Sequence, residues 1–131
     1  MERHSVCVID DDANVRQTIR TILETVGYMT AEASDGEQGL EAIARTGATI
    51  AVVDIIMPNR EGLETIAEAK TRFPSLKILA ISGSERAIGS QGYLALATAI
   101  GADDVLRKPL RAEELLAKIK RLVEADPPAT R

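Results

Sequence analysis

Short apolar runs alternate along the chain with longer segments in which apolar residues recur every three or four positions. The short runs are rich in β-branched residues, which is typical of strands buried on both faces of a sheet. Such runs occupy residues 6–9, 49–53 and 76–81, and weaker ones occupy residues 28–33 and 104–107. The segments between and after them have the spacing of amphipathic helices. The pattern therefore predicts five strands that alternate with five helices.

Capping residues bound the first two helices. Asp12 is placed to cap the first helix and Gly27 to end it. Ser34 or Asp35 opens the second helix, and Gly47 closes it. These residue types are favoured at those positions because a short polar side chain accepts from free backbone N–H groups, and glycine adopts the left-handed turn.

A long loop is predicted between the fourth strand and the fourth helix. Gly83, Gly89 and Gly92 follow Ser82, and the helical pattern is clear only over residues 93–100. Glycine is permissive in conformation, so this loop is expected to carry mobility, and we expect part of it to reorder when the domain changes state.

Alternating strands and helices predict a parallel sheet covered by helices on both faces. Right-handed crossovers leave few topologies, and for a chain of 131 residues the best is the α/β flavodoxin-like (βα)5 doubly wound sheet, with strand order 2-1-3-4-5. The length argues for one domain, over residues 1–125, and residues 126–131 are expected to be a disordered tail. The strand at residues 104–107 is more polar and is expected at an edge.

Composition excludes several classes of protein. No apolar run approaches the roughly 20 residues of a membrane span, and the N-terminus has no secretory pattern. Cys7 is the single cysteine and His4 the single histidine, which argues against disulfides and zinc sites. A net charge of −4 with three aromatic residues disfavours direct nucleic-acid binding. A cytoplasmic domain is expected.

Charged and hydroxyl residues follow four of the predicted strands. Asp10 and Asp11 come after the first strand, Asp54 ends the third, Ser82 ends the fourth, and Lys108 follows the fifth. Ligands of open parallel sheets bind beyond the carboxyl ends of the strands, so these side chains are expected to converge. Clustered carboxylates stay ionised beside a cation, and an oxygen-only site suits Mg²⁺. Mg²⁺ with a lysine supplies the charge that phosphoryl transfer needs, and a carboxylate can be its nucleophile.

At these residues the chain resembles a known family, the response-regulator receiver domains of two-component signalling. The matching stretches are residues 8–12, 53–58, 81–83 and 101–109. Each stretch alone is a weak signal, but all four in this order and at these spacings are a strong one. The resemblance extends over roughly residues 4 to 125.

The resemblance implies a role for each residue at the strand ends. Asp54 would be the phosphoacceptor, Asp11 would bind Mg²⁺ directly, and Asp10 would hold its water shell, with Asp54 and the backbone carbonyl of Ile56 as further ligands. Lys108 would pair with Asp54 and then with the phosphoryl group. The phosphoryl donor would be a histidine kinase or a histidine phosphotransfer protein. Such a domain assists its own phosphorylation and dephosphorylation but is not an enzyme that turns over a small molecule.

The resemblance also implies a switch and a partner surface. Ser82 would bond a phosphoryl oxygen, and the peptide bond before Pro109 would be cis. Val105 departs from the family, which has Tyr or Phe there, so the usual coupling between the hydroxyl and a swinging ring is in doubt. The surface offered to a downstream protein target would include Tyr93, Leu94, Arg107 and Arg111.

Other functions stay open at this point. A phosphorylation-independent binding module would keep the pocket without using it. A Mg²⁺-dependent phosphohydrolase of the haloacid-dehalogenase type would use Asp10 as nucleophile, with Asp12 two residues later. No glycine-rich phosphate-binding motif is present, which disfavours a nucleotide-binding enzyme. No output domain follows the last helix, so both a single-domain regulator and a piece of a longer one remain open.

Overall fold

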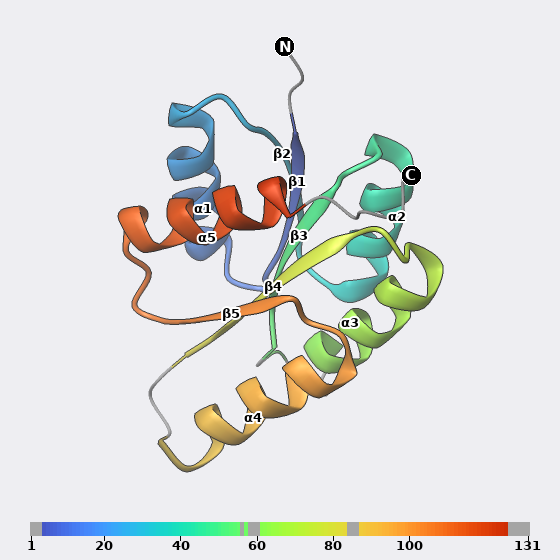
Figure 1. Cartoon of the computed structure of the whole chain (residues 1–131), viewed down its shortest axis with the longest axis vertical. Helices are drawn as coiled ribbons and strands as arrows, with labels where there is room; N and C mark the ends of the chain where they lie inside the picture. Colours follow the sequence, from blue (N-terminus) through green and yellow to red (C-terminus); the bar gives the residue numbers. More distant parts are fainter. Residues whose placement is uncertain (1–3, 56, 58–60, 84–86, 126–131) are drawn as a thin grey trace.

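The computed structural model describes residues 4–55, 57, 61–83 and 87–125. Over these residues the chain forms five strands and five helices in strict alternation (Figure 1). The strands are β1 (Ser5–Ile9), β2 (Met29–Ala33), β3 (Ile50–Asp54), β4 (Lys77–Ser82) and β5 (Asp104–Arg107). The helices are α1 (Ala13–Thr25), α2 (Gly36–Thr46), α3 (Glu61–Arg72), α4 (Ala87–Ile100) and α5 (Ala112–Glu124).

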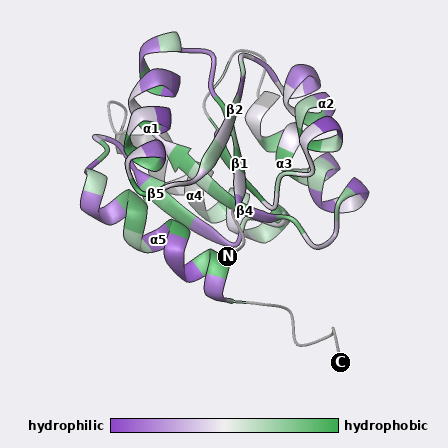
Figure 2. Ribbon diagram, turned by 90° about the horizontal axis from the view of Figure 1, so that it is seen from above, coloured by the Kyte–Doolittle hydropathy of each residue, from purple (hydrophilic) through white to green (hydrophobic). Residues whose placement is uncertain are grey.

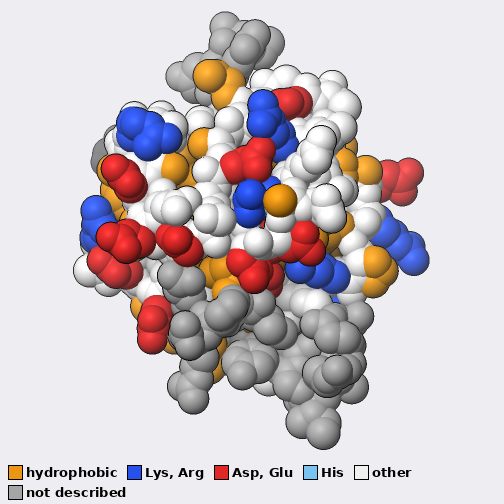
Figure 3. Space-filling model, turned by 180° about the vertical axis from the view of Figure 1, so that it is seen from behind, with side chains coloured by type: hydrophobic (Ala, Val, Ile, Leu, Met, Phe, Trp, Pro, Cys, Tyr) orange, Lys and Arg blue, Asp and Glu red, His pale blue; other side chains and the backbone are white. Residues whose placement is uncertain are grey.

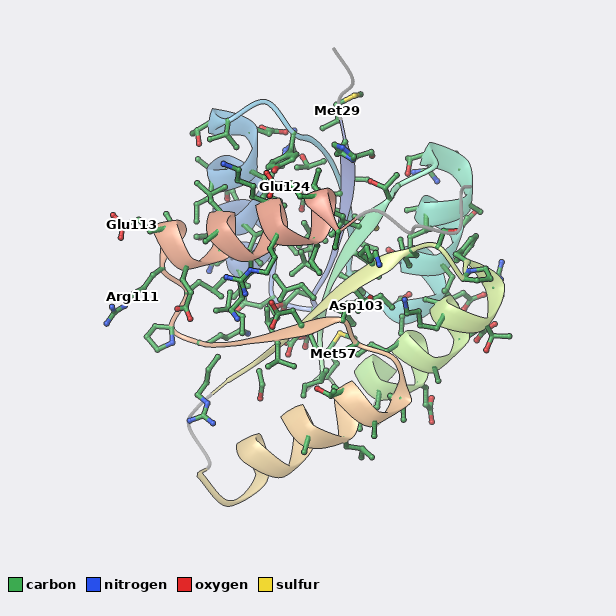
Figure 4. All side chains as sticks on the ribbon, in the orientation of Figure 1. Met29, Met57, Asp103, Arg111, Glu113 and Glu124 are labelled. Atoms are coloured by element: carbon green, nitrogen blue, oxygen red, sulfur yellow. The ribbon has the colours of Figure 1, made fainter. Side chains whose placement is uncertain are left out.

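The strands form one parallel sheet in the order β2-β1-β3-β4-β5. This confirms the predicted flavodoxin-like topology, with β5 at an edge. Parallel pairing places all carboxyl ends of the strands at the same end of the sheet. Figure 4 shows the two ends: Met29, at the start of β2, lies at one, and Met57, just beyond β3, lies at the other.

Two apolar layers sandwich the sheet because successive strand side chains point to opposite faces. In β1, Val6 and Val8 belong to the core beneath α1 and α5, whereas Cys7 and Ile9 belong to the core beneath α2, α3 and α4. Seen from above, α1 and α2 stand on opposite sides of β1 and β2 (Figure 2). The central strands are therefore buried on both faces, which makes them a rigid support for residues at their ends.

The predicted caps of the first two helices are present. The side chain of Asp12 accepts from the Asn14 N–H at 2.9 Å, and that of Asp35 accepts from the Gln38 N–H at 2.8 Å. Gly47 ends α2 in the left-handed conformation, with φ of 70°.

The prediction of a long loop before the fourth helix was wrong, because the helix begins earlier than residue 93. Helix α4 begins at Ala87 and includes Gly89 and Gly92, so the structure places only residues 83–86 between β4 and this helix. Each interior glycine costs a helix about 1 kcal/mol relative to alanine. The alanine- and leucine-rich second half of the helix and the packing of Ala97 into the core offset that cost.

Some predictions concern the limits of the domain. The boundary at residue 125 stays a prediction, and residues 126–131 lie outside the described residues. Across the described part of the chain, no helix is both long enough and apolar enough to cross a bilayer.

Helix α2 lies so close to β1 that any side chain at one of its glycines would have to displace a core side chain. A Cβ on Gly39 would collide with Ile9, whose Cγ1 would lie 2.8 Å away and whose Cδ1 would be closer still. We expect Gly39→Ala to lower the free energy of unfolding by about 1–3 kcal/mol through overpacking, measured by urea denaturation. Adding Ile9→Val removes Cδ1 and should restore part of the loss.

Gly92 provides the matched control for this substitution. It is exposed in α4, and a Cβ there would meet nothing within 4 Å. Gly92→Ala should therefore raise the free energy of unfolding by about 0.5–1 kcal/mol. Equal effects at the two glycines would contradict the packing described for α2.

Candidate functional site

Three carboxylates meet where β1 and β3 end. These strands are neighbours in register, with Ile9 paired to Val53, so Asp10 and Asp54 follow at the same level. One carboxylate oxygen from each of Asp10, Asp11 and Asp54 lies within 4.8 Å of the others. Asp10 and Asp54 are buried, and Asp11 is exposed. The structure thus brings together the acidic residues that the sequence placed at these strand ends.

Lys108, which follows the edge strand β5, completes the cluster. Its Nζ lies 3.6 Å from Oδ2 of Asp10 and 3.6 Å from Oδ2 of Asp54. Its backbone N–H donates to the Ser82 carbonyl at 2.8 Å, which fixes the chain where it leaves β5. The bond between Lys108 and Pro109 is cis, as the resemblance implied.

The charges of the cluster do not balance. Burial raises the pKa of the Asp10 carboxyl and Asp11 adds to the rise, while the Asp12 N–H and Lys108 oppose it. Oδ1 of Asp10 accepts from the Asp12 N–H at 2.9 Å, but Oδ2 has no hydrogen-bond partner among the described residues. Three carboxylates and one lysine leave a charge of −2 when all are ionised. That is the charge that a divalent cation would offset.

The donor set fits Mg²⁺ in particular. Among the described residues, the candidate ligands are three carboxylates, of which those of Asp10 and Asp54 are buried and that of Asp11 is exposed to water. Mg²⁺ prefers oxygen ligands and retains several waters, so a few carboxylates suffice. The predicted further ligand, the carbonyl of Ile56, lies outside the described residues.

Two contacts near the cluster were not predicted from the sequence. A Cβ on Gly62, in the first turn of α3, would collide with the backbone of Asp54 and Ile55, so this helix meets the end of β3 backbone to backbone. Arg16 of α1 donates from Nη1 to the backbone carbonyl of Asp10 at 2.7 Å. Neither residue belongs to a strand end, so local sequence patterns carry no signal that links them to the site.

Comparisons with known proteins agree with this geometry. The family model described as the response regulator receiver domain matches residues 6–120. The chain belongs to the response-regulator receiver domains. A curated relative, the response regulator MprA of Mycobacterium leprae, is 35% identical over 127 residues, which cover 94% of this chain and 52% of the relative. The receiver domain therefore spans about half the length of that curated relative.

Solved structures show the same fold. The receiver domain of NtrX from Brucella abortus matches with a TM-score of 0.84 at 28% identity, covering 92% of this chain and 99% of that one. A CheY-like receiver domain protein from Methanospirillum hungatei matches with a TM-score of 0.83 at 29% identity, covering 94% of this chain and 96% of that one. Receiver domains are signalling modules.

The predicted switch residues of this receiver domain lie on β4 and β5. Ser82 is buried, and its hydroxyl donates to the Gly83 carbonyl at 3.1 Å. Val105 pairs with Ala80 across the sheet and packs half-buried against the core beneath α2, α3 and α4. A valine in this place is held by packing, and it has no ring that could swing outward.

The predicted partner surface is only partly described. Arg107 and Arg111 are both exposed, and Arg111 points away from the body of the receiver domain at the start of α5 (Figure 4). The side chains of Tyr93 and Leu94 lie outside the described residues. Leu96, on the same helix, is 47% exposed.

Removing the Asp10 charge tests the electrostatics of the site. In Mg²⁺-free buffer at neutral pH, we expect Asp10→Asn to raise the free energy of unfolding by on the order of 1 kcal/mol, because it removes one of three crowded carboxylates. Since burial raises the pKa of Asp10, its penalty is present above that pKa and disappears as the pH falls and the carboxyl is protonated. The difference between variant and wild type should therefore shrink toward acid pH.

Mg²⁺ should reverse the order of stability. Saturating Mg²⁺ should stabilise the wild type more than Asp10→Asn, measured as the shift in the urea midpoint. Asp12→Asn is the matched control, because Asp12 is exposed, outside the cluster, and asparagine caps a helix equally well. A lower stability of Asp10→Asn than wild type without Mg²⁺ would contradict the imbalance of charge.

Proposed function

We propose that Asp54 is the phosphoacceptor of this receiver domain and takes a phosphoryl group from a phosphohistidine of a kinase or phosphotransfer protein in a Mg²⁺-dependent step. The observation that carries the proposal is the position of Asp54. Its carboxylate ends the central strand β3, lies within the three-carboxylate cluster, and has the Lys108 ammonium 3.6 Å away.

In the proposed step, a carboxylate oxygen of Asp54 attacks phosphorus in line with the P–N bond of the donor. The O–P bond forms as the P–N bond breaks, and the ring nitrogen leaves with the bonding pair as neutral imidazole, its other nitrogen keeping its proton. Mg²⁺, when bound, neutralises charge on the phosphoryl oxygens. Lys108 contributes a second positive charge there, and it is held ready by its backbone bond to Ser82.

Holding the cation is the role we propose for the remaining carboxylates. Asp11 would bind it directly, Asp10 through its water shell, and Asp54 and the Ile56 carbonyl would be further ligands. Hydrolysis would return the domain to its first state: water attacks phosphorus, the Asp54 carboxylate leaves with the bonding pair, and the inorganic phosphate released carries both protons of the water.

The output of the switch would pass through β4 and β5 to the surface that includes Arg107 and Arg111. Ser82 would bond a phosphoryl oxygen after losing its present bond to the Gly83 carbonyl. Because Val105 has no ring to swing, the change would reach the partner surface through shifts of the backbone at these strand ends. Phosphorylation would thereby switch the binding of a downstream protein or make the domain a relay.

The geometry weighs against the phosphohydrolase alternative. That mechanism needs the second aspartate, Asp12, to act beside Asp10. In the structure Asp12 is exposed, lies outside the carboxylate cluster, and uses its side chain to cap α1.

Incubation with acetyl phosphate and Mg²⁺ tests the proposed chemistry. We expect the intact mass of the wild type to rise by one phosphoryl group and that of Asp54→Asn to stay unchanged. Omitting Mg²⁺ should abolish the gain. Beryllofluoride or a cognate kinase extends the test if the small donor fails.

Asp12→Asn is again the matched control in this assay. It should be phosphorylated like the wild type, whereas a phosphohydrolase would lose its second aspartate. A phosphoryl group that still forms in Asp54→Asn would contradict the assignment of Asp54. No modification by any of the three reagents would favour the phosphorylation-independent binding module.

Lys108 is expected to act in the transfer step rather than in cation binding. Lys108→Met keeps the apolar stem and removes the charge, so the rate of phosphorylation should fall by about 10²-fold. Mg²⁺ affinity should not fall, because a competing positive charge is lost. Lys118→Met is the control: Lys118 pairs with Asp104 and should leave the rate unchanged. An unchanged rate in Lys108→Met would contradict this role.

A further inference from the structure

Arg16 connects the acidic cluster to the edge strand β2. Its Nη1 donates to the Asp10 carbonyl at 2.7 Å, and its Nε donates to Oε1 of Glu32, on β2, at 3.0 Å. The Arg16 side chain is 17% exposed, whereas Glu32 lies at the exposed edge strand β2, where two arginines cover part of its carboxylate. One guanidinium therefore donates two hydrogen bonds, one to the backbone of the acidic cluster and one to the Glu32 carboxylate.

The Glu32 carboxylate is itself held from two sides. Oε2 accepts from Nη1 of Arg20 at 2.9 Å, and Arg20 also pairs with Glu24 at 3.0 Å. These bonds lower the pKa of Glu32, Arg20 having the largest effect, so the residue stays ionised. Acidic and basic side chains alternate down the middle of the molecule seen from behind (Figure 3). Arg16 is therefore paired with a carboxylate that a second arginine also holds.

These contacts hold the backbone of Asp10 on both sides. The Asp10 N–H donates to the Ala33 carbonyl at 3.1 Å, one residue beyond Glu32, and the Asp10 carbonyl accepts from Arg16. That carbonyl belongs to the peptide bond that leads into Asp11. The orientation of this peptide sets the direction in which the Asp11 side chain leaves the backbone.

Asp11 depends on this backbone more than its neighbours do. Asp10 is buried and bonded to the Asp12 N–H, whereas Asp11 is exposed and has no side-chain hydrogen bond or ion pair to any described residue. Among the described residues, only the conformation of its own backbone therefore places the Asp11 carboxylate in the cluster.

We propose that Arg16 is a positioning residue that orients the peptide between Asp10 and Asp11 for divalent-cation binding, with Glu32 as its anchor. The proposal rests on the proposed function, because it takes the acidic cluster to be the cation site. Removal of a group that hydrogen-bonds and orients a metal ligand typically lowers metal affinity by about 10- to 100-fold.

The sign of the effect separates positioning from simple electrostatics. A positive charge near the cluster repels a cation, so its removal should strengthen Mg²⁺ binding if charge alone matters. If Arg16 acts by orienting the peptide, its removal should weaken binding.

Titration calorimetry with Mg²⁺ on the intact chain tests the proposal. We expect Arg16→Gln to weaken Mg²⁺ binding about 10-fold. Arg20→Gln is the matched control: Arg20 carries the same charge and also bonds Glu32, but it does not contact Asp10, and Arg16 keeps its own bond to Oε1 of Glu32, so binding should stay within about 2-fold of wild type. Arg16→Lys keeps the charge but has one nitrogen in place of the fork, and it should also bind more weakly than wild type.

The outcomes are distinct. Stronger or unchanged Mg²⁺ binding by Arg16→Gln, in a variant that unfolds cooperatively, would overturn the positioning role. A loss of stability in Mg²⁺-free buffer with no loss of affinity would show a structural role only. If Arg16→Gln fails to fold, wild-type affinity in Arg16→Lys would overturn the proposal. Absence of Mg²⁺ binding by the wild type would instead refute the cation site, and with it the proposed function.

Discussion

Three carboxylates at the ends of β1 and β3 repel one another, and the rest of this receiver domain has to hold them together. One lysine, 3.6 Å from two of them, is too little charge to balance the group. Such a site stays assembled only because the strands that hold it cannot move apart. Val8, Ile9, Val52 and Val53 are fully buried between the two helical layers, and that packing stabilises the arrangement.

Main-chain contacts hold the site as much as side chains do. The Asp10 N–H and carbonyl are bonded to β2 and α1, the Lys108 N–H to the end of β4, and α3 starts against the Asp54 backbone at Gly62. Each contact joins a different element to the same end of the sheet. A cation or phosphoryl group that pulls on the carboxylates would thereby reach four elements at once, which suits a domain that signals by small movements.

Much of this could be predicted from the sequence because the signals are local or topological. β-Branched runs identify strands, Asp12 and Asp35 identify helix starts, and parallel topology then brings Asp10, Asp54 and Lys108 to one end. The start of α4 was missed because Gly89 and Gly92 are typical of loops, whereas the helix continues through both. Arg16 and Gly62 were missed because their partners are backbone atoms brought close only by the fold.

We propose that the carboxylate cluster binds a cation and presents Asp54 as the phosphoacceptor. The most direct test of this proposal is a crystal structure of the chain grown with Mg²⁺ and beryllofluoride, which mimics an acyl phosphate. We expect beryllium bonded to a carboxylate oxygen of Asp54, the cation between Asp10 and Asp11, and the Lys108 ammonium against a fluoride. Beryllofluoride bonded to Asp10, or a cation bound away from these three carboxylates, would contradict it.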